Sequence, residues 1–288
     1  MFVVTGASGN TGSVVATTLL ERGEKVRVVV RDEARGAALR ARGAEVHVAG
    51  LEDVAALTAA LRGAEGAYLI VPPDYAAKEY LAGRRVVVDA IAQALEASPV
   101  PRAVVLSSVG ADGAGPLGLI ASNRYAEERL TRTRGHVTFL RASYFMENWL
   151  SVLPVAREHG VLPTMLRADR AIPMVSTVDI GRVAADLLRA SSPPGHVVAL
   201  TGPSPVSPDD VAAALGRALA KPIATAPVAD AEIVGILESG GFSRDVAQLF
   251  REMVRGINDG SIAFRAEDEA RTVRGTTTLE AAVARWLA

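Results

Sequence analysis

The sequence predicts an α/β protein built on a doubly wound parallel sheet of the Rossmann type, followed by a smaller, mostly helical C-terminal part. Three observations support this. Short β-branched runs alternate with segments of helical period, glycines follow the expected helices, and a glycine-rich turn lies between the first strand and the first helix. This alternation is typical of parallel strands whose connecting helices cover both faces. Right-handed crossovers then lead to a doubly wound strand order.

The first half of the chain alternates regularly between the two kinds of element. Strands are expected at residues 2–5, 25–31, 45–48, 66–71 and 102–107. Helices are expected at residues 12–22, 33–42, 53–61 and 77–97. The fourth strand should stop at Pro72, because proline cannot donate a ladder hydrogen bond.

The second half is less regular and is expected to be mostly helical beyond residue 207. Helices are expected at residues 123–134, 180–190, 209–218, 229–238 and 243–258, and strands at 136–141 and 197–201. A helix over residues 144–159 should be kinked at Pro154, which lacks a backbone N–H.

Composition excludes several classes of function. The chain has 288 residues, a net charge of −1 and no cysteine, so disulfides, thiolate nucleophiles and cysteine-based metal centres are ruled out. The balanced charge argues against nucleic-acid binding, and the four histidines lack metal-ligand spacing. Without a signal peptide or an 18-residue apolar run, we expect a cytoplasmic protein with no membrane association, either a monomer or a homodimer.

A phosphate-binding turn is predicted where the sequence reads G-A-S-G-N-T-G between the first strand and the first helix. Gly6 permits the turn, Gly9 lets the backbone approach a pyrophosphate, and Gly12 allows close packing. The free N–H groups at the helix start attract phosphate. The alternative is a strand–turn–helix that uses glycines for geometry alone. The cofactor contacts expected here are Gly6, Ser8, Gly9, Asn10, Thr11 and Gly12.

The end of the second strand should read the ribose of the dinucleotide. Arg31 stands at this terminus and Arg35 follows one turn later, which favours the 2′-phosphate of NADP(H). In the alternative, Asp32 binds the ribose hydroxyl of NAD(H) and the arginines are solvated. Residues 1–150, with strands from about 175–202, are then the nucleotide-binding domain. Residues 151–174 and 203–288 form a smaller substrate-binding domain.

Several segments resemble the NmrA-like, atypical short-chain dehydrogenase/reductase family. They are the glycine turn, Y-F-M-E-N at residues 144–148, D-I-G at 179–181, and a C-terminal run from G-G-F at 240–242 to G-T-T at 275–277. The last is similar to the branch that contains NAD(P)H:quinone reductases and triarylmethane dye reductases. The resemblance implies a nicotinamide over the ends of the fourth and fifth strands. It adds Gly50, Leu51, Val71, Pro72, Ser107 and Phe145 to the expected cofactor contacts.

Two positions depart from the family pattern. Many members carry an aspartate after the third strand, where this chain reads Ala49-Gly50-Leu51. Quinone reductases of this branch carry a histidine, and other members a lysine, four residues before a glutamate in the helix after the fifth strand. Asn123 occupies that position, before Glu127.

The proton donor of ordinary short-chain dehydrogenases is absent, since no Tyr-x-x-x-Lys occurs in the chain. Tyr125 and Arg129 have the spacing but lie too late, and Tyr125 is expected to pack on the sheet. Reduction of a plain ketone makes an alkoxide that needs a proton donor, whereas a reduced quinone is a phenolate-like anion and a cationic acceptor needs no proton. We therefore expect a reductase of quinone-, enone- or dye-like acceptors, with Asn123, Ser107 or Tyr144 donating a hydrogen bond.

Aromatic and polar side chains around this region are candidates for acceptor contacts. The substrate-binding residues expected are Tyr75, Ser108, Asn148 and Trp149, and Tyr80, Phe145 and Met165 are further candidates for the walls. Core packing is the alternative for each aromatic residue. A non-catalytic NADP(H)-binding redox sensor, or an isomerase that borrows the fold, is the alternative for the whole protein.

Overall fold

An eight-stranded parallel sheet forms the centre of the computed structural model, which describes residues 1–192, 195–265 and 272–288. Its strands are β1 (Phe2–Thr5), β2 (Val26–Val30), β3 (Glu45–Val48), β4 (Gly66–Leu69), β5 (Arg102–Ser108), β6 (His136–Ala142), β10 (Val197–Thr201) and β13 (Val273–Arg274). The order is β13-β10-β6-β5-β4-β1-β2-β3. The chain therefore changes direction across the sheet between β1 and β4, the switch point beside which ligands bind in such sheets.

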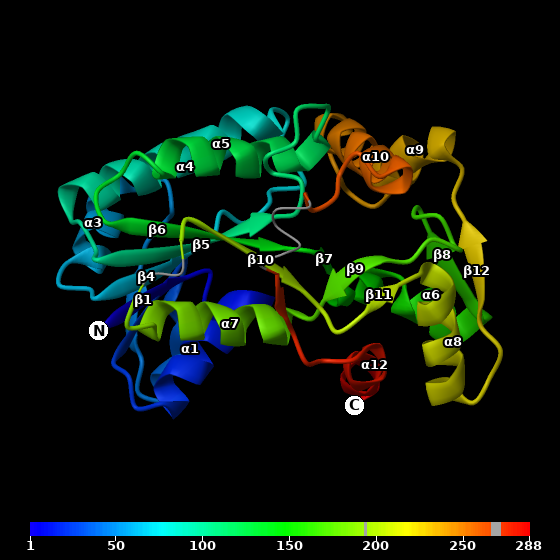
Figure 1. Ribbon diagram of the computed structural model, residues 1–288, viewed down its shortest axis with the longest axis horizontal. Coiled ribbons are helices and arrows are strands. Elements are labelled where there is room, and N and C mark those ends of the chain that lie inside the picture. The colour runs from blue at the N-terminus through cyan, green and yellow to red at the C-terminus, as the bar shows by residue number, and fades with distance from the viewer. Residues whose placement is uncertain (193–194, 266–271) are drawn as a thin grey trace.

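Helices cover both faces of this sheet (Figure 1). On one face lie α1 (Asn10–Glu21) and α7 (Thr177–Arg189), and on the other lie α3 (Val54–Leu61), α4 (Tyr80–Ala97) and α5 (Ala121–Leu130). Side chains alternate along β1, so that Val4 packs in the core under α1 and α7 and Val3 in the core under α3 and α4. The predicted fold class is confirmed.

The C-terminal part has a hydrophobic core of its own. Its elements are β7 (Tyr144–Phe145), η3 (Met146–Ser151), α6 (Leu153–His159), β8 (Val161–Thr164), β9 (Ile172–Val175), β11 (Pro205–Val206), α8 (Pro208–Leu219), β12 (Ala224–Pro227), η4 (Asp230–Glu232), α9 (Ile233–Ser239), α10 (Arg244–Asp259) and α12 (Leu279–Leu287). The short elements η1 (Glu33–Gly36), α2 (Ala37–Arg40) and η2 (Gly118–Ile120) lie instead in connections of the large sheet. Trp149, Leu162, Leu215 and Val283 join this core. Two small sheets, β11-β9-β7 and β12-β8, build its frame.

Three expected helices differ in the structure. The segment expected as one helix over 144–159 is the strand β7, the 3₁₀ helix η3 and the short helix α6. Pro154 stands in the first turn of α6 and so begins that helix instead of kinking it, because a first-turn N–H has no intrahelical partner. The helices expected at 33–42 and 229–238 each begin as a 3₁₀ turn. Among the described residues, no helix combines the length and apolar content needed to cross a bilayer.

Candidate active site

The glycine turn after β1 has the geometry that its spacing predicts. Gly6 has φ +60°, in the left-handed region that side chains disfavour. A Cβ on Gly12 would lie 2.4 Å from the carbonyl oxygen of Gly6. The N–H of Gly9 donates to that same oxygen over 2.9 Å. Only glycine therefore fits at position 12, where α1 passes directly over the turn.

The N-terminus of α1 is left open by this turn. Gly9 is the N-cap residue and has no side chain, and the first turn of the helix carries no acidic residue. Ser8 and Asn10 are exposed beside it. Thr11 is buried, and its hydroxyl accepts a hydrogen bond of 2.9 Å from the phenol of Tyr68. The backbone N–H groups at the positive end of the helix dipole are thus open to an anion.

At the end of β2 the two expected arginines behave differently. Arg31 is exposed and has no hydrogen bond or ion pair with any described residue. The guanidinium of Arg35 instead bonds the carboxylate of Asp32, with 2.8 Å between Nε and Oδ2. The other oxygen of Asp32 accepts the backbone N–H of Arg35 over 3.0 Å. Both carboxylate oxygens of Asp32 are engaged, while the charge of Arg31 is available to a ligand.

The end of β3 supplies the next expected contacts. Gly50 is half-buried, and its carbonyl accepts the N–H of Asp53 over 3.2 Å, just before α3 begins. Leu51 is half-buried and packs against the core under α3 and α4. At this position, where many family members carry an aspartate, the side chain of Leu51 offers only apolar contacts.

The segment after β4 is held by residues that are distant in the sequence. Val71 is buried, and its carbonyl accepts a hydrogen bond from Nη1 of Arg84. Pro72 is exposed. Tyr75 is 43% exposed, and its ring stacks on that of Phe242 with centroids 4.6 Å apart. The turn between α9 and α10 therefore forms a wall beside the end of β4.

Backbone contacts strengthen this junction. The N–H of Ser243 donates to the carbonyl of Tyr75 over 2.9 Å, and its hydroxyl donates to the carbonyl of Ala77 over 2.6 Å. The carboxylate of Asp245 accepts the N–H of Tyr80 over 2.9 Å and so caps α4. The start of α10 thus fixes the position of the loop that carries Tyr75.

At the end of β5, Ser107 is part of a buried ionic network. Its hydroxyl donates to the carboxylate of Glu127 over 2.6 Å. Arg141 binds the other oxygen of Glu127 at 2.7 Å and reaches Asp112 at 3.0 Å. Because a serine hydroxyl carries one proton, Ser107 has only acceptor lone pairs left for a ligand in this arrangement. The hydroxyl of Ser108 donates to the carbonyl of its neighbour Val109 over 3.1 Å.

Asn123 lies on α5, one turn before Glu127, and is half-buried. Its neighbour Ser122 accepts a hydrogen bond from Nε of Arg84 over 3.3 Å. Helix α5, which carries Asn123, is therefore linked to Ser107 through Glu127. It is also linked to the end of β4 through Arg84. Tyr125 packs against the sheet and its phenol donates to Asp89 over 2.9 Å, as expected of a structural residue.

The Tyr144–Trp149 segment contributes one phenol and a buried indole. Burial raises the pKa of Tyr144 to about 12, and hydrogen bonding with Asn148 opposes that rise. Trp149 is 4% exposed and belongs to the C-terminal core, so its ring packs there and lies 6.3 Å from the ring of Tyr144. Phe145 packs partly on the core under α1. Asn148 is exposed.

Glu147 connects this segment to the start of α7. Its carboxylate accepts the hydroxyl of Ser176 over 2.7 Å and the N–H of Thr177 over 2.8 Å, at the start of α7. Asp179, in the first turn of the same helix, accepts the N–H of Thr277 over 2.8 Å. These two carboxylates join the three C-terminal segments that resemble the family. Met165 packs in a separate cluster against α9 and α10.

The residue that sequence reasoning missed is Arg84. It is buried, its guanidinium lies 5.6 Å from the ring centroid of Tyr80, and its charge acts on both Tyr75 and Tyr80. The sequence could have indicated the burial of Arg84, since it lies four residues from Tyr80 and four from Val88, both on the buried face of α4. The stack of Tyr75 on Phe242 had no signal in the local sequence.

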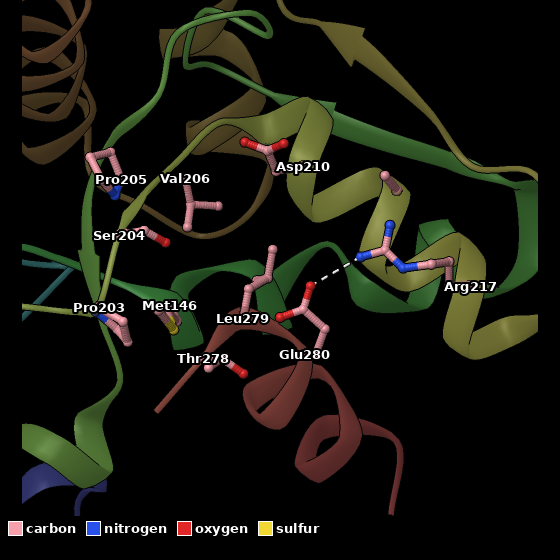
Figure 2. Close-up of a pocket in the computed structure, with 11 residues that line it drawn as sticks. Met146, Pro203, Ser204, Pro205, Val206, Asp210, Arg217, Thr278, Leu279 and Glu280 are labelled. Atoms are coloured by element: carbon pink, nitrogen blue, oxygen red, sulfur yellow. Dashed lines mark hydrogen bonds and ion pairs between the residues drawn. The ribbon is translucent and has the colours of Figure 1, made fainter. Parts of the chain in front are cut away.

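A pocket of about 320 Å³ opens elsewhere, in the C-terminal part (Figure 2). It is lined by Met146, Pro203, Ser204, Pro205, Val206, Asp210, Ala213, Arg217, Thr278, Leu279 and Glu280. Its charged groups already have partners: Arg217 pairs with Glu280 at 3.1 Å, and Asp210 completes the capping box of α8. The glycine turn and the end of β4 do not contribute to it, so the expected cofactor contacts lie outside this pocket.

The chain is similar to known reductases over nearly its whole length. The chain is 28% identical over 286 residues to quinone oxidoreductase 2 of Escherichia coli (strain K12), covering 98% of this chain and 97% of that protein. It superposes on the NADPH complex of an NADPH-dependent quinone oxidoreductase from Escherichia coli with a TM-score of 0.82, at 27% identity and full coverage of both chains. The triphenylmethane reductase of Citrobacter sp. complexed with NADP(H) shares the fold at 20% identity, with a TM-score of 0.83 and coverage of 99% and 100%. The model of the NmrA-like family matches residues 1–281, and the chain belongs to that family.

Proposed function

We propose that this protein is an NADPH-dependent oxidoreductase that reduces a conjugated small-molecule acceptor of quinone, enone or dye type without a tyrosine–lysine acid. The observation that carries the proposal is the open N-terminus of α1 above the Gly6–Gly12 turn, together with Arg31 at the end of the next strand, whose side chain pairs with no described residue. Residues 1–150 with the strands from about 175–202 would bind the nucleotide. Residues 151–174 and 203–288 would complete the acceptor site.

The chain's residues fit NADPH at each end of the expected site. The turn offers backbone N–H groups for the pyrophosphate, and Arg31 offers a cation for the 2′-phosphate. Asp32 is occupied by Arg35, which disfavours a ribose hydroxyl as its partner. Val71 and Pro72 would border the nicotinamide. When bound there, NADPH supplies a hydride equivalent.

The acceptor class follows from the acidity of the groups around it. The phenol of Tyr144 has a pKa near 12, while a reduced quinone is a phenol-like acid with a pKa of about 10. Full proton transfer from Tyr144 is therefore uphill by roughly 2 pKa units, or on the order of 3 kcal/mol. Tyr144 and Asn123 would donate hydrogen bonds to such an anion, and the final proton would come from solvent. A plain ketone needs a proton donor in the transition state, and a phenol whose pKa is raised is a weaker general acid for that step than a tyrosine whose pKa is lowered by a lysine.

Aromatic rings support the same class of acceptor. Tyr75 presents an exposed face beside the end of β4, and Phe242 holds it in place. Flat conjugated molecules stack well on such rings. Trp149 packs in the C-terminal core and would hold the ring of Tyr144 in position from that side.

The test is steady-state NADPH oxidation by a panel of quinones, enones and cationic dyes beside simple ketones. We expect conjugated acceptors to give higher kcat/KM than ketones. Higher values for ketones would contradict the proposed acceptor class.

A non-catalytic redox sensor is the second candidate. The engagement of the Ser107 proton by Glu127 favours it, because that hydroxyl cannot also donate to a substrate. A sensor would bind NADPH and NADP⁺ with different affinities, measurable by calorimetry, and would oxidise NADPH with none of the acceptors.

A further inference from the structure

Arg84, on α4, carries a guanidinium that the fold encloses. The residue is 9% exposed. Nη1 donates to the carbonyl of Val71 and Nε donates to the hydroxyl of Ser122 over 3.3 Å. The group also lies over the ring of Tyr80. All of these partners are neutral.

The charge of Arg84 has no counter-ion within the part of the chain that the structure describes. Across residues 1–192, 195–265 and 272–288, no carboxylate forms an ion pair with it. Arg141, which is also buried, pairs with both Glu127 and Asp112. Burial lowers the pKa of Arg84, yet a guanidinium stays protonated at neutral pH. A buried charge without a partner is costly, so its retention calls for an explanation.

One edge of this guanidinium borders solvent-accessible space. Nη2 donates no hydrogen bond to a described residue, and it is not among the unpartnered side-chain atoms sealed from solvent, which are Ser143 Oγ and Trp149 Nε1. Arg84 bonds the end of β4 at Val71 and the neighbour of Asn123, and its charge acts on Tyr75. The guanidinium therefore lies between the end of β4 and the helix that carries Asn123, two elements expected to border the acceptor cleft.

We propose that Arg84 is a catalytic residue that donates from Nη2 to the carbonyl oxygen of the acceptor and stabilises the negative charge formed there. A neutral quinone or enone that gains a hydride from NADPH becomes a monoanion, NADP⁺ leaves, and one proton from solvent completes the reduced product. The same fixed cation repels an acceptor that is already positive. The site would thus select neutral or anionic conjugated carbonyls over cationic dyes. The inference rests on the proposed reductase function and narrows its acceptor class.

The first test compares a neutral naphthoquinone with a cationic triarylmethane dye. For Arg84→Gln we expect kcat/KM with the quinone to fall at least tenfold, and the ratio of dye to quinone turnover to rise by a similar factor. Arg84→Lys should recover part of the quinone activity. Arg85→Gln is the matched control, because Arg85 is exposed and lies over Tyr125 on the outer side. Loss of both activities in equal measure, as expected of a merely structural arginine, would overturn the proposal.

The second test does not depend on turnover. 4-Nitrophenol is titrated into the NADP⁺-loaded protein, and the coloured phenolate is followed against pH. We expect the bound phenol in wild type and Arg85→Gln to have a lower pKa than the free probe, and this lowering to disappear in Arg84→Gln. A probe that does not bind the wild type, or an equal pKa in all three proteins, would overturn the role of Arg84. An absence of NADPH oxidation with every acceptor would instead remove the reductase function, whatever the phenolate shows.

Discussion

The carboxylate of Asp32 is held by Arg35 through two hydrogen bonds, 2.8 Å from the side chain and 3.0 Å from the backbone N–H. Arg31, one residue earlier, has no such partner among the described residues. Two arginines four residues apart thus differ in their contacts: Arg35 holds Asp32, and Arg31 is the one proposed to bind the 2′-phosphate.

Arg31→Ala is expected to weaken NADPH binding and leave NADH binding nearly unchanged. A charge-assisted hydrogen bond contributes about 1.5–3 kcal/mol, which corresponds to roughly a 10- to 100-fold rise in Kd. Fluorescence titration with both cofactors measures this. Arg40→Ala, which removes an exposed arginine paired with Glu33, is the control. Equal losses for NADPH and NADH would mean that Arg31 does not bind the 2′-phosphate.

Gly12→Ala is expected to damage both the nucleotide site and the fold. The new Cβ would lie 2.4 Å from the carbonyl of Gly6, so α1 must move away from the turn. Overpacking of this kind costs about 1–3 kcal/mol, and the NADPH Kd should rise at least tenfold. Calorimetry and thermal unfolding check the two effects. Gly235→Ala, a helical glycine with open space around it, should leave NADPH affinity unchanged.

Tyr144→Phe is expected to lower kcat/KM with quinones about five- to tenfold, because one hydrogen bond to the product anion is lost. The pKa of Tyr144 near 12 predicts that wild-type activity shows no titration of this phenol from pH 7 to 10. Tyr125→Phe, on the outer side of α5, serves as the control. A rate that follows a group with a pKa near 8, lost in Tyr144→Phe, would show that Tyr144 is a true acid.

The raised pKa of Tyr144 also predicts how the free energy of unfolding changes at alkaline pH. Its folded pKa is raised above the ordinary tyrosine value of about 10, so the folded state holds the proton longer than the unfolded state. Its contribution is fully present below pH 10 and is lost as the pH rises toward 12. Urea unfolding of wild type and Tyr144→Phe between pH 8 and 11 should show a steeper decline for wild type. Parallel curves would contradict the burial of this phenol.

Asp230→Asn is expected to loosen the packing of η4 against α10. Arg251 and Arg255 both bond this carboxylate and lower its pKa. The contribution is present above the ordinary aspartate pKa of about 4 and is lost as the pH falls below it. The Tm difference from wild type should therefore be largest near pH 7 and shrink in acid. Glu238→Gln, an exposed carboxylate on α9, should give no such pH-dependent difference.

The parts of the site that were predictable from sequence are those set by local chain geometry. The glycine spacing, the strand before it and the helix after it lie within one short segment, so the turn around Gly6 and Gly12 follows from backbone sterics alone. The alternation of strands and helices likewise predicted the sheet and both helical layers. The family resemblance predicted the contribution of the Tyr144–Trp149 segment to the cleft, which stays a prediction.

The remaining parts depend on contacts between distant segments. Nothing near Tyr75 indicates that Phe242 stacks on it, and nothing near Glu147 indicates that it caps α7. The short strands β8 and β12 each contain a proline and pair only with each other, so neither has the apolar alternation of a predictable strand. Arg84 was overlooked because a charged residue on a helix is usually solvated, and only its buried neighbours four residues away mark it as enclosed.

The central claim, hydride transfer from NADPH to a conjugated acceptor, is tested most directly by single-turnover mixing of the NADPH-loaded protein with a naphthoquinone. Ordinary NADPH is compared with NADPH that carries deuterium at the transferred position, and acetophenone replaces the quinone in a parallel experiment. We predict stoichiometric oxidation by the quinone, slower with the deuterated cofactor, and little oxidation by acetophenone. NADPH that survives the quinone unchanged, or that acetophenone oxidises faster, would contradict the account.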